Sequence, residues 1–108
     1  MKNMKKIKEN DIFNSNMGIT SFYQVTKVYD SGRVRVRKIE KEEIPTECGY
    51  EFLAKPQKNK FCQDDKGAIK LVQYFDDGTP YLQLVGYDYA TLYKGKPVIS
   101  SYWNVWMR

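Results

Sequence analysis

The chain has 108 residues, of which 42% are hydrophobic and 29% are charged, so its composition is that of one folded domain and excludes a disordered tail or a multidomain enzyme. The formal net charge is +5, and the absence of histidine removes the commonest general base and metal ligand together. There is no apolar run of membrane-helix length and no apolar stretch of a secretory signal, which together predict a protein that acts in the cytoplasm.

The positive charge is concentrated in two segments. Residues 1–10 carry four lysines against one glutamate, and residues 31–38 carry three arginines and one lysine with no acidic residue. We expect residues 1–10 to form a flexible basic arm and residues 11–108 to form a single β-rich domain. Charge localised in this way indicates contact with an anionic partner, and the alternative is that it only keeps the protein dissolved.

A hairpin is predicted in the first part of the domain. Residues 19–30 are rich in β-branched and aromatic side chains, and Asp30-Ser31-Gly32 supplies turn residues. In residues 33–39, arginine and valine alternate, so we expect a strand with the arginines on one face and the valines on the other.

The remainder of the chain predicts more short strands. β-propensity and turn residues place them at residues 50–53, 69–75, 81–85 and 98–103. Between them we expect a charged connector at residues 40–47 and an exposed loop at residues 56–67. Because no helical periodicity is present, the prediction is a mainly β fold: a single antiparallel sheet curled into a small barrel or roll, with at most one short helix.

Arg33, Arg35, Arg37 and Lys38 are the first candidate binding residues. Side chains at positions i and i+2 of a strand lie about 6.6–7 Å apart, close to the spacing of successive phosphates. Such a row can follow a nucleic-acid backbone or contact an acidic protein. The alternative is a solvated outer face whose charge discourages pairing between sheet edges.

Three tyrosines in the last third of the chain, Tyr87, Tyr89 and Tyr93, are the second set of candidates. Exposed tyrosines on a sheet can stack on bases or anchor a protein interface. We expect most of the aromatic residues to fill the core, and a few to lie exposed beside the arginines.

Catalysis has little support in the sequence. The paired carboxylates Asp64-Asp65 and Asp76-Asp77 lie beside turns, where aspartate binds its own backbone, and the serines and cysteines have no histidine to activate them. We therefore expect no enzyme activity, no cofactor and no metal site, with a magnesium-dependent nuclease as the alternative. Cys48 and Cys62 are expected to be free thiols, the alternative being a disulfide between them.

Several segments resemble small proteins encoded by phages and mobile genetic elements. The resemblance spans residues 10–103, with residues 40–67 outside any matching pattern, and rests on Asp11-Ile12-Phe13, Phe22-Tyr23-Gln24-Val25, Tyr87-Asp88-Tyr89-Ala90-Thr91-Leu92-Tyr93, Gly95-Lys96-Pro97 and Tyr102. It implies a phage or plasmid origin and action inside a bacterial host cell, and it supplies no catalytic residues.

Small non-enzymatic proteins of this kind often bind and block a host defence complex, as anti-CRISPR proteins do. The resemblance therefore implies a non-catalytic binding protein that antagonises a host defence nuclease, either a protein or a ribonucleoprotein. Because the chain is net basic, we expect contact through aromatic and loop residues or with bound RNA, and no mimicry of DNA. The alternative is a small nucleic-acid-binding module that uses the basic strand and exposed aromatic side chains.

Overall fold

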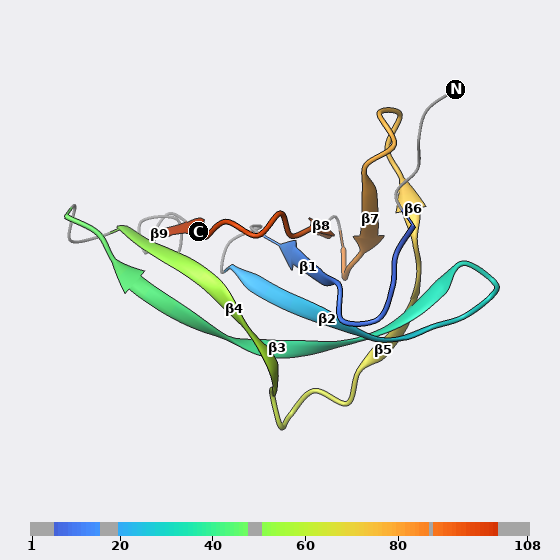
Figure 1. The fold of residues 1–108 in the computed structure, drawn as a ribbon, viewed down its shortest axis with the longest axis horizontal. Helices are drawn as coiled ribbons and strands as arrows, with labels where there is room; N and C mark the ends of the chain where they lie inside the picture. Colours follow the sequence, from blue (N-terminus) through green and yellow to red (C-terminus); the bar gives the residue numbers. More distant parts are fainter. Residues whose placement is uncertain (1–5, 16–19, 48–50, 87, 102–108) are drawn as a thin grey trace.

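The structure, a computed structural model, describes residues 6–15, 20–47, 51–86 and 88–101 (Figure 1). Within these residues the fold is mainly β and contains no helix, and therefore no helix that is long and apolar enough to cross a membrane. The strands are β1 (Ile12–Ser15), β2 (Ser21–Val28), β3 (Arg33–Pro45), β4 (Glu51–Phe61), β5 (Ala68–Leu71), β6 (Gln73–Tyr74), β7 (Pro80–Gln83), β8 (Tyr89–Leu92) and β9 (Val98–Ser101).

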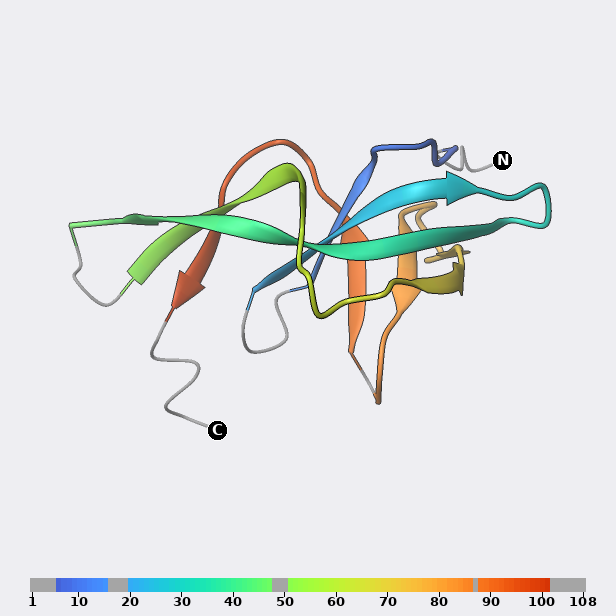
Figure 2. The same cartoon turned by 90° about the horizontal axis from the view of Figure 1, so that it is seen from below.

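These strands form one antiparallel sheet, as the sequence predicts. The strand order is β6-β7-β8-β1-β2-β3-β4-β9, and β5 pairs with the first part of β3 on the edge that β4 uses further along. In the described residues, β6 and β9 are the ends of this order and do not pair with each other, so the sheet is not closed into a barrel. β3 runs along the molecule, with β4 and β9 at one end and the β6–β7 hairpin at the other (Figures 1 and 2).

The predicted hairpin at residues 19–39 is confirmed, but two neighbouring predictions are wrong. Residues 40–45, expected to be a connector, continue β3 and pair with β4, and residues 56–61, expected to be a loop, belong to β4. Most charged residues of these segments are exposed, Lys55 and Glu42 form an ion pair at 3.4 Å, and the half-buried Lys41 donates its ammonium to the carbonyl oxygen of Thr20 at 2.7 Å. The register between β3 and β4 shifts after Pro56, and Asn59 in this stretch has a φ of 70°. The segment of low β-propensity is therefore a bulge in β4.

Two hydrophobic cores lie on opposite faces of the sheet. Val36 belongs to the first core and Ile39 to the second. These two residues of β3 are three positions apart, so their side chains point to opposite faces of the sheet. Core 1 contains Ile7, Phe13, Val25, Val34, Val36, Leu82 and Ala90. Core 2 contains Phe22, Ile39 and Ala54, with Ile12, Phe61, Tyr93 and Val98 packed against them. Ile7 is thus buried, although it precedes the predicted start of the domain, and residues 1–5 of the predicted arm lie outside the described residues.

A buried glutamine joins three segments beside core 2. The Gln24 side chain is 1% exposed, and its Nε2 donates hydrogen bonds to Oδ1 of Asn10 at 3.1 Å and Oδ1 of Asn59 at 2.8 Å. The backbone N–H of Asn59 donates in return to Gln24 Oε1 at 2.8 Å. This exchange satisfies the buried amide and fixes the β4 bulge against β2.

Candidate functional site

A group of exposed cationic side chains lies on one face of β2, β3 and β5. Lys27 on β2, Arg35 on β3 and Ile69 on β5 lie side by side and form one row across the three strands. Arg33 on β3 and Leu71 on β5 lie side by side in the next row. Residues opposite each other in an antiparallel pair point to the same face. We call these five residues the basic face.

The position of the basic face follows from the path of β3. Val34 and Val36 point into core 1, so the arginines between them point to the opposite face, which carries core 2 further along the strand. Along core 2 the neighbour of β3 is β4, whereas β5 is its neighbour at Arg33 and Arg35. The basic face therefore lies where β5 takes the place of β4 beside β3.

All five residues of the basic face are exposed, and within the described part of the chain no carboxylate neutralises its charge. Among the described residues, no ion pair joins Lys27, Arg33 or Arg35 to a carboxylate. Arg35 Nη2 donates to the carbonyl oxygen of Lys66 at 3.2 Å, and the Lys27 ammonium lies 5.1 Å from the centroid of the Tyr29 ring. A carbonyl group and an aromatic ring hold a cation without cancelling its charge, so the three cations remain available to an anionic partner.

The third arginine of the row, Arg37, has a structural position. Its guanidinium lies over the Phe61 ring, with 4.6 Å between its central carbon and the ring centroid. Its Nε donates to the carbonyl oxygen of Asp65 at 3.2 Å, and its Nη2 donates to that of Cys62 at 3.5 Å. Arg37 therefore holds the loop between β4 and β5, and the exposed row is reduced to Arg33 and Arg35.

Asp65 organises the same loop. Its carboxylate accepts hydrogen bonds from the backbone N–H groups of Lys38 and Gly67. This is the use of aspartate at a turn that the sequence predicts. Lys38 itself lies opposite Tyr23 and points to the face opposite Arg37, so its exposed side chain is not part of the basic face.

The two described candidate tyrosines, Tyr89 and Tyr93, do not belong to the strands that carry Arg33 and Arg35 or to their neighbours in the sheet. Tyr89 is 41% exposed and stands edge-on to Phe75 and Tyr81, which stack on each other with ring centroids 4.1 Å apart. Tyr93 packs edge-on against Phe22 in core 2, with 5.5 Å between centroids. Tyr89 is the first residue of β8, and Tyr93 comes directly after its last residue. In the sheet order, β1 and β2 lie between β8 and β3. Tyr87 lies outside the described residues.

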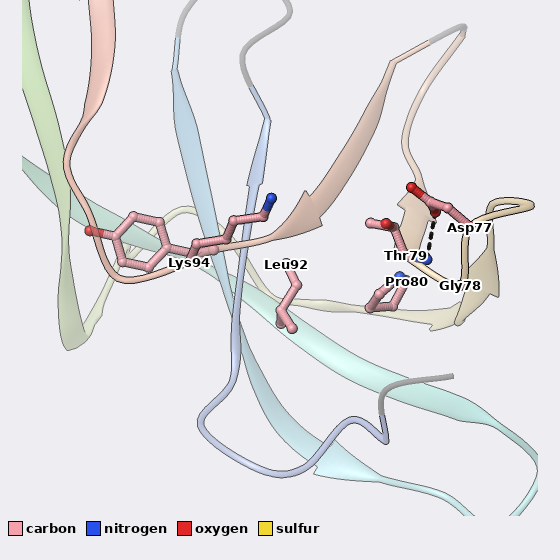
Figure 3. Close-up of a pocket in the computed structure, with 7 residues that line it drawn as sticks. Asp77, Gly78, Thr79, Pro80, Leu92 and Lys94 are labelled. Atoms are coloured by element: carbon pink, nitrogen blue, oxygen red, sulfur yellow. Dashed lines mark hydrogen bonds between the residues drawn. The ribbon is translucent and has the colours of Figure 1, made fainter. Parts of the chain in front are cut away.

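Asp77, from the carboxylate pair at residues 76–77, borders an open hollow of about 480 Å³ (Figure 3). Asp77 Oδ1 accepts a hydrogen bond from the backbone N–H of Thr79 at 2.9 Å. Lys94 and Asp77, the charged residues that line the hollow, lie on opposite sides of Leu92 in Figure 3. No group of three or more Cys, Asp or Glu side chains in the described residues is placed to hold a metal ion.

Cys62 is a free, partly exposed thiol. Partial burial raises the pKa of the Cys62 thiol, and the nearby Glu40 carboxylate raises this pKa further. A thiol held in its neutral form is a poor nucleophile. Cys48 lies outside the described residues.

No protein-family model, no curated protein and no solved structure matches this chain. The resemblance to phage proteins therefore stays a prediction, and the candidate site rests on geometry. Lys27, Ile69 and Leu71 are not among the binding residues predicted from the sequence. Alternation around Lys70 marks Ile69 and Leu71 as a pair on one face, but only the pairing of β5 with β3 places them beside the arginines.

Proposed function

We propose that this protein is a non-catalytic binding protein that engages an anionic surface of its partner through the basic face. The observation that carries the proposal is the set of three exposed cations, Lys27, Arg33 and Arg35, without a carboxylate partner among the described residues. Cations left unpaired in neighbouring rows of a sheet create a local positive potential that accelerates and orients encounter with an acidic surface.

The partner that we propose is a host defence nuclease, in the form of a protein or a ribonucleoprotein. This part of the proposal is supported by the resemblance stated above. If this protein bound an acidic patch of such a nuclease, it would block cleavage of the target without catalysing any reaction itself. A binding role needs neither of the carboxylate pairs, which serve turns at Asp65 and Asp77.

A nucleic-acid-binding module is the second candidate, because Arg33 and Arg35 occupy positions i and i+2 of one strand. Their spacing of about 6.6–7 Å suits successive phosphates. Such a module would bind free guide or target nucleic acid, with an affinity that falls steeply as salt is added.

A titration of an RNA-guided nuclease tests the proposal. The purified chain is added to the assembled nuclease while target cleavage is measured, and the migration of free guide and target is followed in the same samples. We expect inhibition without a shift of free nucleic acid. We expect the variant Arg33→Ala/Arg35→Ala to need at least about tenfold more protein for the same inhibition, equivalent to about 1.4 kcal/mol.

The matched control is Lys94→Ala/Lys96→Ala, which removes two exposed positive charges from the connection between β8 and β9. It lowers the net charge as much as the arginine variant does and should inhibit like the original chain. Equal loss in both variants would show that only net charge matters and would contradict the proposed face. A salt-sensitive shift of free nucleic acid would support the second candidate instead.

A further inference from the structure

We infer that the basic face takes an acidic protein segment that carries aliphatic side chains, in preference to a nucleic acid. The inference rests on the proposed function, because it names the class of partner for the same face. It starts from the β3–β5 register, which places Ile69 directly beside Arg35 and Leu71 directly beside Arg33.

Ile69 and Leu71 are exposed aliphatic residues that do not contribute to either hydrophobic core. Ile69 and Leu71 are 53% and 45% exposed, and neither belongs to core 1 or core 2. The exposed apolar surface of each side chain is removed from water only when a partner covers it. A partner that also carries apolar groups would gain about 25 cal/mol for every Å² of apolar surface that is buried.

The charges of the face select the same partner. A row with Lys27, Arg35 and Ile69 lies next to a row with Arg33 and Leu71, so the cations of β2 and β3 border the two aliphatic side chains of β5. The complement of this pattern is a segment in which carboxylates and aliphatic side chains are adjacent. The nearest acidic residue along the chain is Asp30, in the turn between β2 and β3, and no ion pair in the described residues connects it to Arg33.

Nucleic acid fits the face less well, because binding of single strands without sequence preference depends on exposed aromatic rings for base stacking. Among the described cations, Lys27 contacts the Tyr29 ring and Arg37 contacts the Phe61 ring, so each of these rings already receives a cation. The exposed aromatic residues Phe75 and Tyr89 lie between β6 and β7 and on β8, outside the three strands of the basic face. The face therefore offers phosphate contacts and aliphatic surface, and the Tyr29 ring beside it is occupied by Lys27.

Fluorescence anisotropy with three synthetic probes tests the inference. The probes are a peptide in which two glutamates alternate with two leucines, so that each face of the extended peptide carries both, a peptide of the same length in which serine replaces leucine, and an oligothymidine of equal charge. We expect the leucine peptide to bind at least about tenfold more tightly than either other probe. The variant Ile69→Ser/Leu71→Ser should remove this difference between the two peptides.

The matched control for the apolar variant is Val85→Ser/Ile99→Ser. Val85 and Ile99 are 88% and 62% exposed and lie outside the basic face, so this variant removes two exposed aliphatic side chains from other surfaces and should bind the leucine peptide like the original chain. Circular dichroism of both variants verifies that the fold is retained.

The outcomes separate the inference from the proposed function. If Arg33→Ala/Arg35→Ala weakens binding, but the leucine and serine peptides bind equally or oligothymidine binds most tightly, the inference is overturned and the basic face stands as a binding site. If the arginine variant changes neither peptide binding nor nuclease inhibition, the proposed function fails as well. Absence of any binding to the leucine peptide also overturns the inference.

Discussion

At the scale of single residues, Gly67 shows how closely the loop before β5 is fitted to the arginine strand. Its φ is +90°, and a Cβ atom at this position would lie 2.8 Å from Arg37 Cγ and 3.0 Å from the Val36 carbonyl oxygen. Both the backbone conformation and the space therefore require glycine.

This requirement leads to a first prediction about stability. We expect Gly67→Ala to lower the free energy of unfolding by at least about 1 kcal/mol more than Gly86→Ala. Gly86 also has a positive φ, of +70°, but a Cβ there meets nothing within 4 Å, so the control carries the backbone strain without the contacts. Urea unfolding of the two variants measures the difference, and equal losses would show that the loop is not packed on Arg37.

Cys62 gives a prediction about pH at the same scale. Since burial and the Glu40 carboxylate both raise its pKa, the thiolate should form only at a pH above that of an unperturbed cysteine. In a Cys48→Ser background, the rate of iodoacetamide alkylation should therefore reach half its maximum at a raised pH. Glu40→Gln removes the negative charge and should move this midpoint to lower pH; an unchanged or higher midpoint would contradict the assigned role of Glu40.

Single residues also show what the sequence can and cannot predict about the site. Alternation with Val34 and Val36 correctly places the arginines on the face opposite core 1. It cannot predict that Arg37 is occupied, because its partners at Cys62 and Asp65 lie more than twenty residues further along the chain. Only the folded position of the loop distinguishes Arg37 from Arg33.

At the scale of elements, β3 performs two tasks along its 13 residues. Its first part pairs with β5 and carries the basic face, and its second part pairs with β4 and closes core 2. Arg37 lies at the change between them and ties the β4–β5 connection to the strand through two carbonyl groups. The structural and binding roles of the arginine row are therefore divided between neighbouring positions.

This division predicts different effects of two similar substitutions. We expect Arg37→Ala to cost about 1–3 kcal/mol of unfolding free energy, because it removes charge-assisted hydrogen bonds and the contact with Phe61. Arg33→Ala, at an exposed position, should change stability by less than about 0.5 kcal/mol. Urea midpoints compare the two variants. A large loss for Arg33→Ala would mean that its role is structural, so that any loss of binding in that variant would no longer support a contact with a partner.

The elements themselves were predictable where local signals were strong. The β2–β3 and β6–β7 hairpins follow from turn residues between segments of high β-propensity. The second part of β3 and the bulged end of β4 were not predictable, because they are charged segments whose strand conformation depends on pairing with each other. Tertiary pairing here outweighs intrinsic propensity.

At the scale of the whole molecule, an open antiparallel sheet buries side chains on both of its faces. The sequence predicts the β class and the single sheet, but not the two cores, because alternation along one strand does not show which strands lie across from it. The consequence for function is that β3 contributes to a core on each face and still leaves one part of a face uncovered. That uncovered part carries the exposed cations.

The most direct test of this account is a map of backbone amide chemical shifts in the ¹⁵N-labelled protein during titration with the glutamate–leucine peptide. The account predicts that the largest shifts fall on the amides of Lys27, Arg33, Arg35, Ile69 and Leu71, and that Arg33→Ala/Arg35→Ala abolishes them. Shifts centred on the aromatic residues of β7 and β8, or an unchanged map in the arginine variant, would contradict the basic face as the binding site.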